Sequence, residues 1–273
     1  MKQLILICLS SLLLFSCSKD TEIAEPLIDA YAAKYMVDMN EGANFTNFQA
    51  YKLEYKDGKV TKRTGGQECV FDNSCQGKSL LDQFNIVDDV TYGKNTISII
   101  NRSGDSQWDI RHWEWLIKLK NPSQIEYLLR KIENHKLYDS LRYVYDADNR
   151  LKQIIKYRVY EDEYEKFAIK DGLKDFFFNT AGNLEKVETR RLLHDGFVIK
   201  MVLERFDDYD TAVNPFRSLF MFDDTFYRSL SNNNFRKYRR QEVELPNGIL
   251  YDTQGRDWDL ECGDANWPFF DKL

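Results

Sequence analysis

The pattern that recurs along this chain is clearest in Tyr143-Val144-Tyr145-Asp146-Ala147-Asp148-Asn149-Arg150-Leu151-Lys152-Gln153-Ile154. Apolar and polar residues alternate on both sides of a short polar centre, as they do along two strands that each bury one face. Asp146 can accept hydrogen bonds from the backbone that follows it, and Asn149 tolerates the left-handed conformation that closes a three-residue loop with a bulge. We therefore predict a β-hairpin that turns between these two residues.

Three further segments repeat the pattern, at residues 51–62, 176–187 and 251–256. Each has an aromatic arm, a polar turn and a glycine or asparagine before the return strand, and the first uses Asp-Gly, a strong hairpin dipeptide. Glycine in the place of Asn149 is expected where φ is positive, because glycine lacks the Cβ that makes this conformation costly. The residues that we expect to define the turns are Asp146, Asn149, Asn179, Gly182, Asp252 and Gly255.

The fold class follows from the spacing of these arms. A hairpin turning at Lys94-Asn95 and an alternating strand from Trp113 to Leu119 extend the series, and an aromatic content of 14% favours sheets. Most arms follow one another without a helix between them, so consecutive strands are expected to pair antiparallel. We predict a mainly β fold, an antiparallel β-meander or barrel-like sheet built from repeated hairpins, with one or two short helices.

Helices are predicted where the strand pattern fails. The strongest candidate covers residues 121–135, where Asn121 fits the cap and Pro122 the first helical position. The apolar residues at helical spacing in this segment are Ile125, Leu128, Leu129 and Ile132. Residues 28–39 and 214–222 are predicted to form shorter helices.

The first 16 residues are predicted to be a lipoprotein signal peptide. An apolar run from Leu4 to Phe15 follows Lys2, and it is too short to span a bilayer, which takes about 20 residues. The run ends in Leu14-Phe15-Ser16-Cys17, which resembles the lipobox of bacterial lipoproteins. The resemblance implies that Cys17 is acylated and holds the protein at the membrane. An ordinary secretory signal peptide is the alternative.

The mature chain then divides into a lipidated tether at residues 17–30 and an antiparallel β-domain at residues 31–273. The charged stretch from Ser18 to Glu22 resembles the surface-export tether of lipoproteins from the Bacteroidota. This resemblance implies a cell-envelope protein of the outer membrane, exposed on the cell surface, and a plain solvated linker is the alternative.

The remaining cysteines suggest a disulfide. Cys69 and Cys75 flank a turn-like Asp-Asn-Ser within residues 63–78, which we predict to be a loop, and they are the candidate pair in an oxidising envelope. Pairing of Cys262 with either of them is the alternative. Without CxxC spacing or a nearby histidine, these cysteines would make poor zinc ligands.

Three common catalytic motifs are absent from the sequence: there is no GxSxG elbow, no HExxH pair and no glycine loop for phosphate. The acidic stretch Asp207–Asp210 lacks the glycine and glutamate of an EF-hand, so we predict a solvated turn rather than a calcium site. The net charge of −6 argues against a nucleic-acid partner. We expect no catalytic residue, no cofactor and no metal.

The tryptophans and one basic run could contribute to a binding surface, but we interpret both as structural. Trp113 and Trp115 share one strand face and are expected in the sheet core, whereas Trp108 and Trp267 are expected to be exposed. The basic run at residues 236–240 is predicted to be a solvated strand edge, where like charges discourage aggregation.

The hairpins resemble YD-repeats. Together with the lipobox and the segment Asp208–Phe216, they make the chain similar to Bacteroidota lipoproteins that contain a domain of unknown function with a porin-like fold. The resemblance covers residues 45–260 and implies a meander that curls towards a barrel, in a soluble domain without assigned catalytic residues.

We therefore expect a non-enzymatic binding or accessory module for a glycan, a peptide or an envelope protein. One alternative is a lipid-anchored hydrolase that acts on surface polysaccharide or peptidoglycan. Another is a structural or protective lipoprotein of the immunity type. The sequence leaves the oligomeric state open.

Overall fold

The computed structural model describes residues 27–32, 36–39, 42–43, 50–66, 84–103, 113–132 and 135–258. Several predicted features lie outside these ranges and are not tested by the structure. They are the signal peptide, most of the tether, Cys17, Cys69, Cys75, Cys262, Trp108 and Trp267. Within the described ranges, no helix is long and apolar enough to cross a bilayer.

The protein is dominated by one antiparallel sheet of 14 strands in which each strand pairs with the next one in order along the chain. Its strands are β1 (Ala30–Ala32), β4 (Ala50–Lys56), β5 (Lys59–Gly66), β6 (Phe84–Tyr92), β7 (Thr96–Ser103), β8 (Trp113–Asn121), β9 (Gln124–Ile132), β10 (Leu137–Tyr145), β11 (Leu151–Glu161), β12 (Lys166–Phe178), β13 (Leu184–Leu192), β14 (Val198–Tyr209), β15 (Phe235–Glu244) and β16 (Ile249–Asp257). A separate two-stranded sheet pairs β2 (Val37–Asp38) with β3 (Gly42–Ala43). The predicted meander is confirmed.

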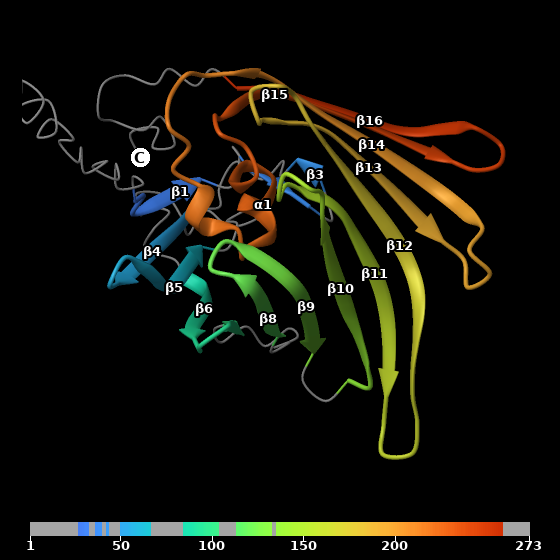
Figure 1. Ribbon diagram of the computed structural model, residues 1–273, viewed down its shortest axis with the longest axis horizontal. Helices are drawn as coiled ribbons and strands as arrows, with labels where there is room; N and C mark the ends of the chain where they lie inside the picture. The colour runs from blue at the N-terminus through green and yellow to red at the C-terminus, as the bar shows by residue number, and fades with distance from the viewer. Residues whose placement is uncertain are drawn as a thin grey trace, which may run out of the picture.

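The sheet curves strongly but does not close. Figure 1 shows it bending around the helix α1 (Asp223–Ser229), with the long strands β10–β16 extending away from that helix on one side. Within the described residues, β1 pairs only with β4 and β16 only with β15, so no strand pair joins the two ends of the sheet. The molecule therefore has a concave face, which is filled only in part.

The turn chemistry of the central hairpin is confirmed. Asp146 Oδ1 accepts the backbone N–H groups of Asp148 and Arg150 at 2.9 and 2.8 Å, and Asn149 adopts a φ of 62°. Asn179 and Gly182 do the same work between β12 and β13, where Gly182 has a φ of 78°. These side chains satisfy backbone donors that the turn would otherwise leave without a partner.

A third copy of this turn was not predicted. Leu193 donates its N–H to the Phe197 carbonyl at 2.8 Å, and Gly196, with a φ of 87°, donates to the Leu193 carbonyl at 2.9 Å. The same two hydrogen bonds close the turn after Asp146. The sequence pattern does not reveal this turn, because Leu193 takes the place that an acidic or amide residue, such as Asp146 or Asn179, has in the other two turns.

The predicted helix over residues 121–135 is wrong. Its described residues contain the end of β8, the turn and the whole of β9, and the Asn121 side chain bonds to Gln124 and to the Ser123 backbone. A register shift next to Leu119 lets Ile125 and Leu128, which are three residues apart, both reach the core. A β-bulge adds one residue to a strand, so apolar positions three apart share a face and imitate helical spacing.

Four other predictions need correction. The described parts of residues 28–39 form the short strands β1 and β2 rather than a helix. Residues 63–66, predicted as the start of a loop, continue β5. Trp113 is 37% exposed rather than buried. The segment predicted to turn at Asp252 and Gly255 lies within β16, because the β15–β16 turn comes earlier, at 245–248.

Gly255 accordingly has no positive φ, and its role is a different one. A Cβ at this position would lie 3.2 Å from Cδ of Arg239 on the neighbouring strand. The glycine leaves room for the arginine to cross β16. Arg239 then donates to the Asp257 carboxylate at 2.6 Å.

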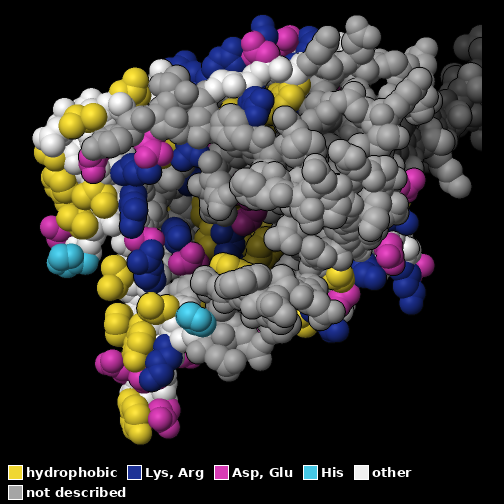
Figure 2. Space-filling model, turned by 180° about the vertical axis from the view of Figure 1, so that it is seen from behind, with side chains coloured by type: hydrophobic (Ala, Val, Ile, Leu, Met, Phe, Trp, Pro, Cys, Tyr) yellow, Lys and Arg dark blue, Asp and Glu magenta, His cyan; other side chains and the backbone are white. Residues whose placement is uncertain are grey.

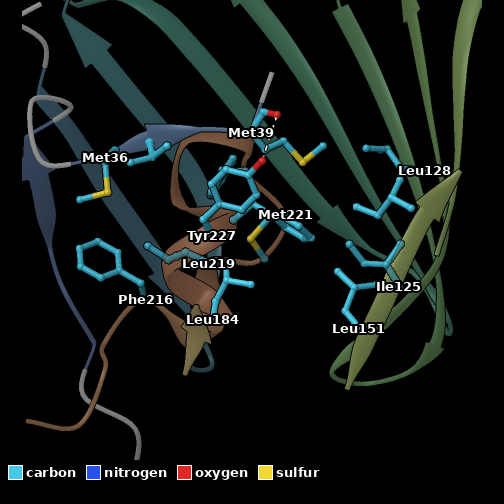
Figure 3. Close-up of a cluster of buried hydrophobic side chains, with 14 of the residues drawn as sticks. Met36, Met39, Ile125, Leu128, Leu151, Leu184, Phe216, Leu219, Met221 and Tyr227 are labelled. Carbon is cyan, nitrogen blue, oxygen red and sulfur yellow. Dashed lines mark hydrogen bonds between the residues drawn. The ribbon is translucent and has the colours of Figure 1, made fainter. Parts of the chain in front are cut away.

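The chain between β14 and β15 enters the concave face as a plug, which we define as residues 214–231. The helix predicted at 214–222 is present in reduced form, as a 3₁₀ turn at Arg217–Leu219 (η4), and α1 follows it. Figure 3 shows plug side chains such as Leu219 and Tyr227 meeting Met39 and Leu184 in one cluster. Burial of this apolar surface, at about 25 cal/mol per Å², stabilises the plug within the curve of the sheet.

Candidate binding cavity

A cavity of about 380 Å³ opens on the concave face beside the plug. Strands β10 to β15 and Met39 form its walls. Figure 2, which shows the molecule from behind, reveals a central hollow with hydrophobic, basic and acidic side chains in it and along its border. A concave site that mixes apolar surface with convergent polar groups is the usual form of a ligand pocket.

The strand register explains why so many charged residues meet here. Lys156, Gly172, Arg191 and Lys200 are partners in successive strand pairs, so they form one row across the concave face. Gly172 has no side chain and leaves a gap in the row between its two basic neighbours. The next row, nearer the plug, consists of Ile154, Lys174, Thr189 and Val202.

The end of the cavity nearest the plug is a chain of buried polar groups. Lys174 Nζ donates to the Tyr227 hydroxyl at 2.7 Å and also to the Met39 carbonyl. Tyr227 and Tyr238 each donate to the Glu204 carboxylate at 2.7 Å, one to each oxygen. Burial lowers the pKa of Lys174, and burial together with the Glu204 carboxylate raises the pKa of both tyrosines. Both tyrosines therefore remain neutral donors at physiological pH.

Ion pairs occupy the β10–β12 side. Lys156 lies 2.9 Å from an Asp139 oxygen and 3.7 Å from an Asp171 oxygen, and Arg158 lies 3.3 Å from the same oxygen of Asp171. The opposite wall repeats the arrangement, because Glu242 pairs with Lys200 and, at 3.2 Å, with Arg240. Each carboxylate at or beside the cavity is therefore held by a cation or by two tyrosines.

The cations outnumber these carboxylates. The basic set is Lys156, Arg158, Lys174, Arg191, Lys200 and Arg240, and the acidic set is Asp139, Asp171, Glu204 and Glu242. Six minus four leaves two positive charges within this set. Arg190 is left out because its guanidinium pairs with Asp175, and Asp223 because it pairs with Arg130. Asp38 also lies outside the set, although its charge acts on Lys174. Among the described residues, Lys174 and Arg191 have no carboxylate within ion-pair distance. Of these two cations, Lys174 is partly buried and Arg191 is exposed. The charge of Lys174 is therefore screened less by water than that of Arg191.

The turn-defining and acidic residues that the sequence analysis singled out do not line this cavity. Asp146, Asn149, Asn179 and Gly182 define turns outside the cavity lining. The Asp207–Asp210 stretch, predicted to be a solvated turn, is for the most part strand, because residues 207–209 form the end of β14, which pairs with β15. Asp208 pairs with Arg236 at 2.6 Å, and Asp210, just beyond the strand, accepts backbone N–H groups. No group of three or more metal-binding side chains is found in the parts of the chain that the structure describes.

The cavity residues were not identified from the sequence. Arg240 belongs to the basic run predicted to be a solvated edge, yet its side chain is buried against the cavity. The others are ordinary lysines and arginines of alternating strands, and nothing local distinguishes them. A strand-by-strand alignment of inward-facing positions would have brought them together, but it requires the register.

No family model and no curated protein matches this chain. Solved structures with a similar fold include a porin-like protein from Bacteroides vulgatus, 15% identical over 87% of this chain and 90% of that one, with a TM-score of 0.47. A porin-like protein from Bacteroides uniformis is 10% identical over 76% and 88% of the two chains, with a TM-score of 0.40. These likenesses concern the fold alone.

Proposed function

We propose that this chain is a non-enzymatic binding protein of the cell envelope whose cavity holds an anionic group of its ligand. The observation that carries the proposal is a pair of cations, Lys174 and Arg191, that line the cavity and have no carboxylate within ion-pair distance among the described residues. A ligand carboxylate or phosphate would neutralise this surplus. Charge-assisted hydrogen bonds of this kind are short and strong.

The state of the cavity carboxylates supports binding over hydrolysis. A glycosidase needs one carboxyl group that can give up a proton and a second that can attack or activate water. Asp171 is held by Lys156 and Arg158, and Glu204 accepts two tyrosine hydroxyls. Neither carboxylate is available for acid–base work without the loss of these contacts.

The proposal places the protein in the outer membrane, exposed on the cell surface and anchored by acylated Cys17. Its support is the lipobox-like sequence before Cys17 and the short charged stretch after it. Confinement at the membrane raises the effective concentration of the cavity near envelope components, so a modest affinity is sufficient.

The test is an anion-dependence experiment on the full-length protein in detergent. An array of acidic and neutral glycans and of acidic and neutral peptides is probed with the wild type and with Arg191→Gln. We expect acidic probes to bind and added salt to weaken their binding. Arg191→Gln should reduce the affinity about tenfold or more, because it removes a hydrogen bond between charged groups.

Arg205→Gln is the matched control, because Arg205 is an exposed arginine of β14 whose strand position alternates with the inward-facing Glu204 and Phe206. The proposal fails if neutral probes bind as well as acidic ones. It also fails if both arginine variants behave alike.

A further inference from the structure

A strip of apolar side chains continues the concave face beyond the cavity. Leu137, Tyr160 and Phe167 are register partners across β10, β11 and β12, and Ile169 stands opposite Arg158. Leu137, Phe167 and Ile169 are 51%, 47% and 41% exposed. We refer to these four residues as the apolar strip.

The strip and the cavity belong to one surface. Lys156, Arg158 and Tyr160 alternate along β11 and so point to the same side of the sheet. Arg158 joins the two regions, because it lines the cavity, pairs with Asp171 and faces Ile169. A molecule that leaves the cavity along β12 would therefore meet the apolar strip.

The aromatic members of the strip are held in place. The Tyr160 and Phe167 rings stack with centroids 5.2 Å apart and an angle of 27° between their planes. The Tyr160 hydroxyl donates to Asp162 at 2.8 Å, which orients the ring. The stacked pair, in which the phenylalanine is half-exposed, offers a flat apolar surface. Because the two rings are already held in place, a ligand that binds there does not have to immobilise them.

We propose that the ligand is an acidic oligosaccharide that lies along β11 and β12. Its carboxylate binds near Arg191 and Lys174, and a sugar ring further along the chain packs on the face of Phe167. The proposal rests on the proposed function of the cavity and names the chemistry of the ligand. Phe167 and Lys174 are seven residues apart, so at a rise of about 3.3 Å per residue this part of the strand spans at most about 23 Å, which accommodates several sugar rings.

Two observations favour a sugar over a peptide. The ion pairs Lys156–Asp139 and Arg158–Asp171 present donors and acceptors side by side, and sugar hydroxyls both donate and accept. An extended peptide would instead bind by main-chain hydrogen bonds at a strand edge. β11 pairs with β10 on one side and β12 on the other throughout this region, so its backbone is already satisfied.

The experiment measures binding of three probes to the full-length protein in detergent by calorimetry. They are an oligogalacturonate, the same oligosaccharide with its carboxylates reduced to alcohols, and an oligoglutamate peptide. Phe167→Ala tests the strip and Arg191→Gln tests the cavity. Phe177→Ala is the matched control, because Phe177 is also exposed on β12, at 39%, but points to the opposite face, where Lys186 covers it. Unchanged melting temperatures verify folding.

We expect the oligogalacturonate to bind, the reduced form to bind at least tenfold more weakly, and Phe167→Ala to weaken binding about tenfold while Phe177→Ala has no effect. Binding lost in Arg191→Gln but unchanged in Phe167→Ala would refute the oligosaccharide path and leave the anion site standing. Tighter binding of the peptide would also refute it. If no acidic probe binds, both proposals are wrong.

Discussion

Arg63 of β5 and Asp224 of α1 are joined by an ion pair of 2.9 Å across 161 residues of sequence. Arg63 also donates to Asp88 at 2.7 Å, and its guanidinium lies between the rings of Tyr51 and Phe222, 4.5 and 4.0 Å from their centroids. One arginine therefore ties the plug to the short strands at the start of the sheet. Because the plug also carries Tyr227, this contact helps to hold the inner end of the cavity in position.

Replacement of Arg63 should be among the most damaging single changes in the protein. Arg63→Met leaves Asp88 and Asp224 buried without their cation, and loss of one member of a buried charge network costs about 3–5 kcal/mol. Urea unfolding measures the cost. Arg102→Met, which breaks the exposed pair with Asp89 two strands away, should cost about 1 kcal/mol or less. Equal costs would contradict a structural role for the Arg63 network.

Alanine substitutions at two turn glycines should distinguish the cost of backbone strain from the cost of side-chain crowding. Gly182 and Gly196 both have positive φ, so alanine is strained at either position by roughly 1 kcal/mol. A Cβ on Gly182 would also lie 2.5 Å from Nδ2 of Asn232, whereas Gly196 has open space. We expect Gly182→Ala to lower the free energy of unfolding more than Gly196→Ala does. Thermal unfolding of both variants measures the difference, and equal losses would show that Asn232 moves aside without cost.

Tyrosine ionisation should destabilise the fold at alkaline pH. Burial raises the pKa of Tyr145 from 10.0 to about 12, and its hydroxyl donates to the Ile125 carbonyl at 2.9 Å. Because the folded-state pKa is the higher one, the hydroxyl contributes fully below pH 10, and its contribution is lost as the pH rises towards 12. Tyr145→Phe should cost about 1 kcal/mol at neutral pH. The difference from wild type should shrink above pH 10 in denaturant titrations, and a constant difference would contradict the raised pKa.

The proposed anchor has a direct test. Cys17→Ala removes the thiol to which we propose that the lipid is attached, so the variant should leave the membrane fraction and appear in the soluble fraction. Fractionation of cells that express each form measures the change. Ser18→Ala, next to the acylation site, is the control and should stay with the membrane. Retention of the Cys17→Ala variant would show that the protein is not held by this lipid.

Prediction from the sequence succeeded where structure depends on neighbours in the chain. The turns at Asp146 and Asn179 rest on side chains that bond to backbone groups a few residues away, and such contacts can be recognised in any context. It failed where a bulge changed the period of a strand, as at Ile125 and Leu128. The prediction also failed at Gly255. This glycine makes room for the side chain of Arg239 on the neighbouring strand and does not form a turn.

The amino-acid sequence alone determined a meander of antiparallel strands, because alternating residues and turn-forming side chains act over short distances. Only the tertiary structure decided that the sheet stays open around a plug and that Lys156, Arg191 and Lys200 share a row. The physical reason is that strand register and curvature depend on packing between distant segments. A shift of one residue in register would turn these charges to the opposite face, so the cavity exists only when the sheet is assembled.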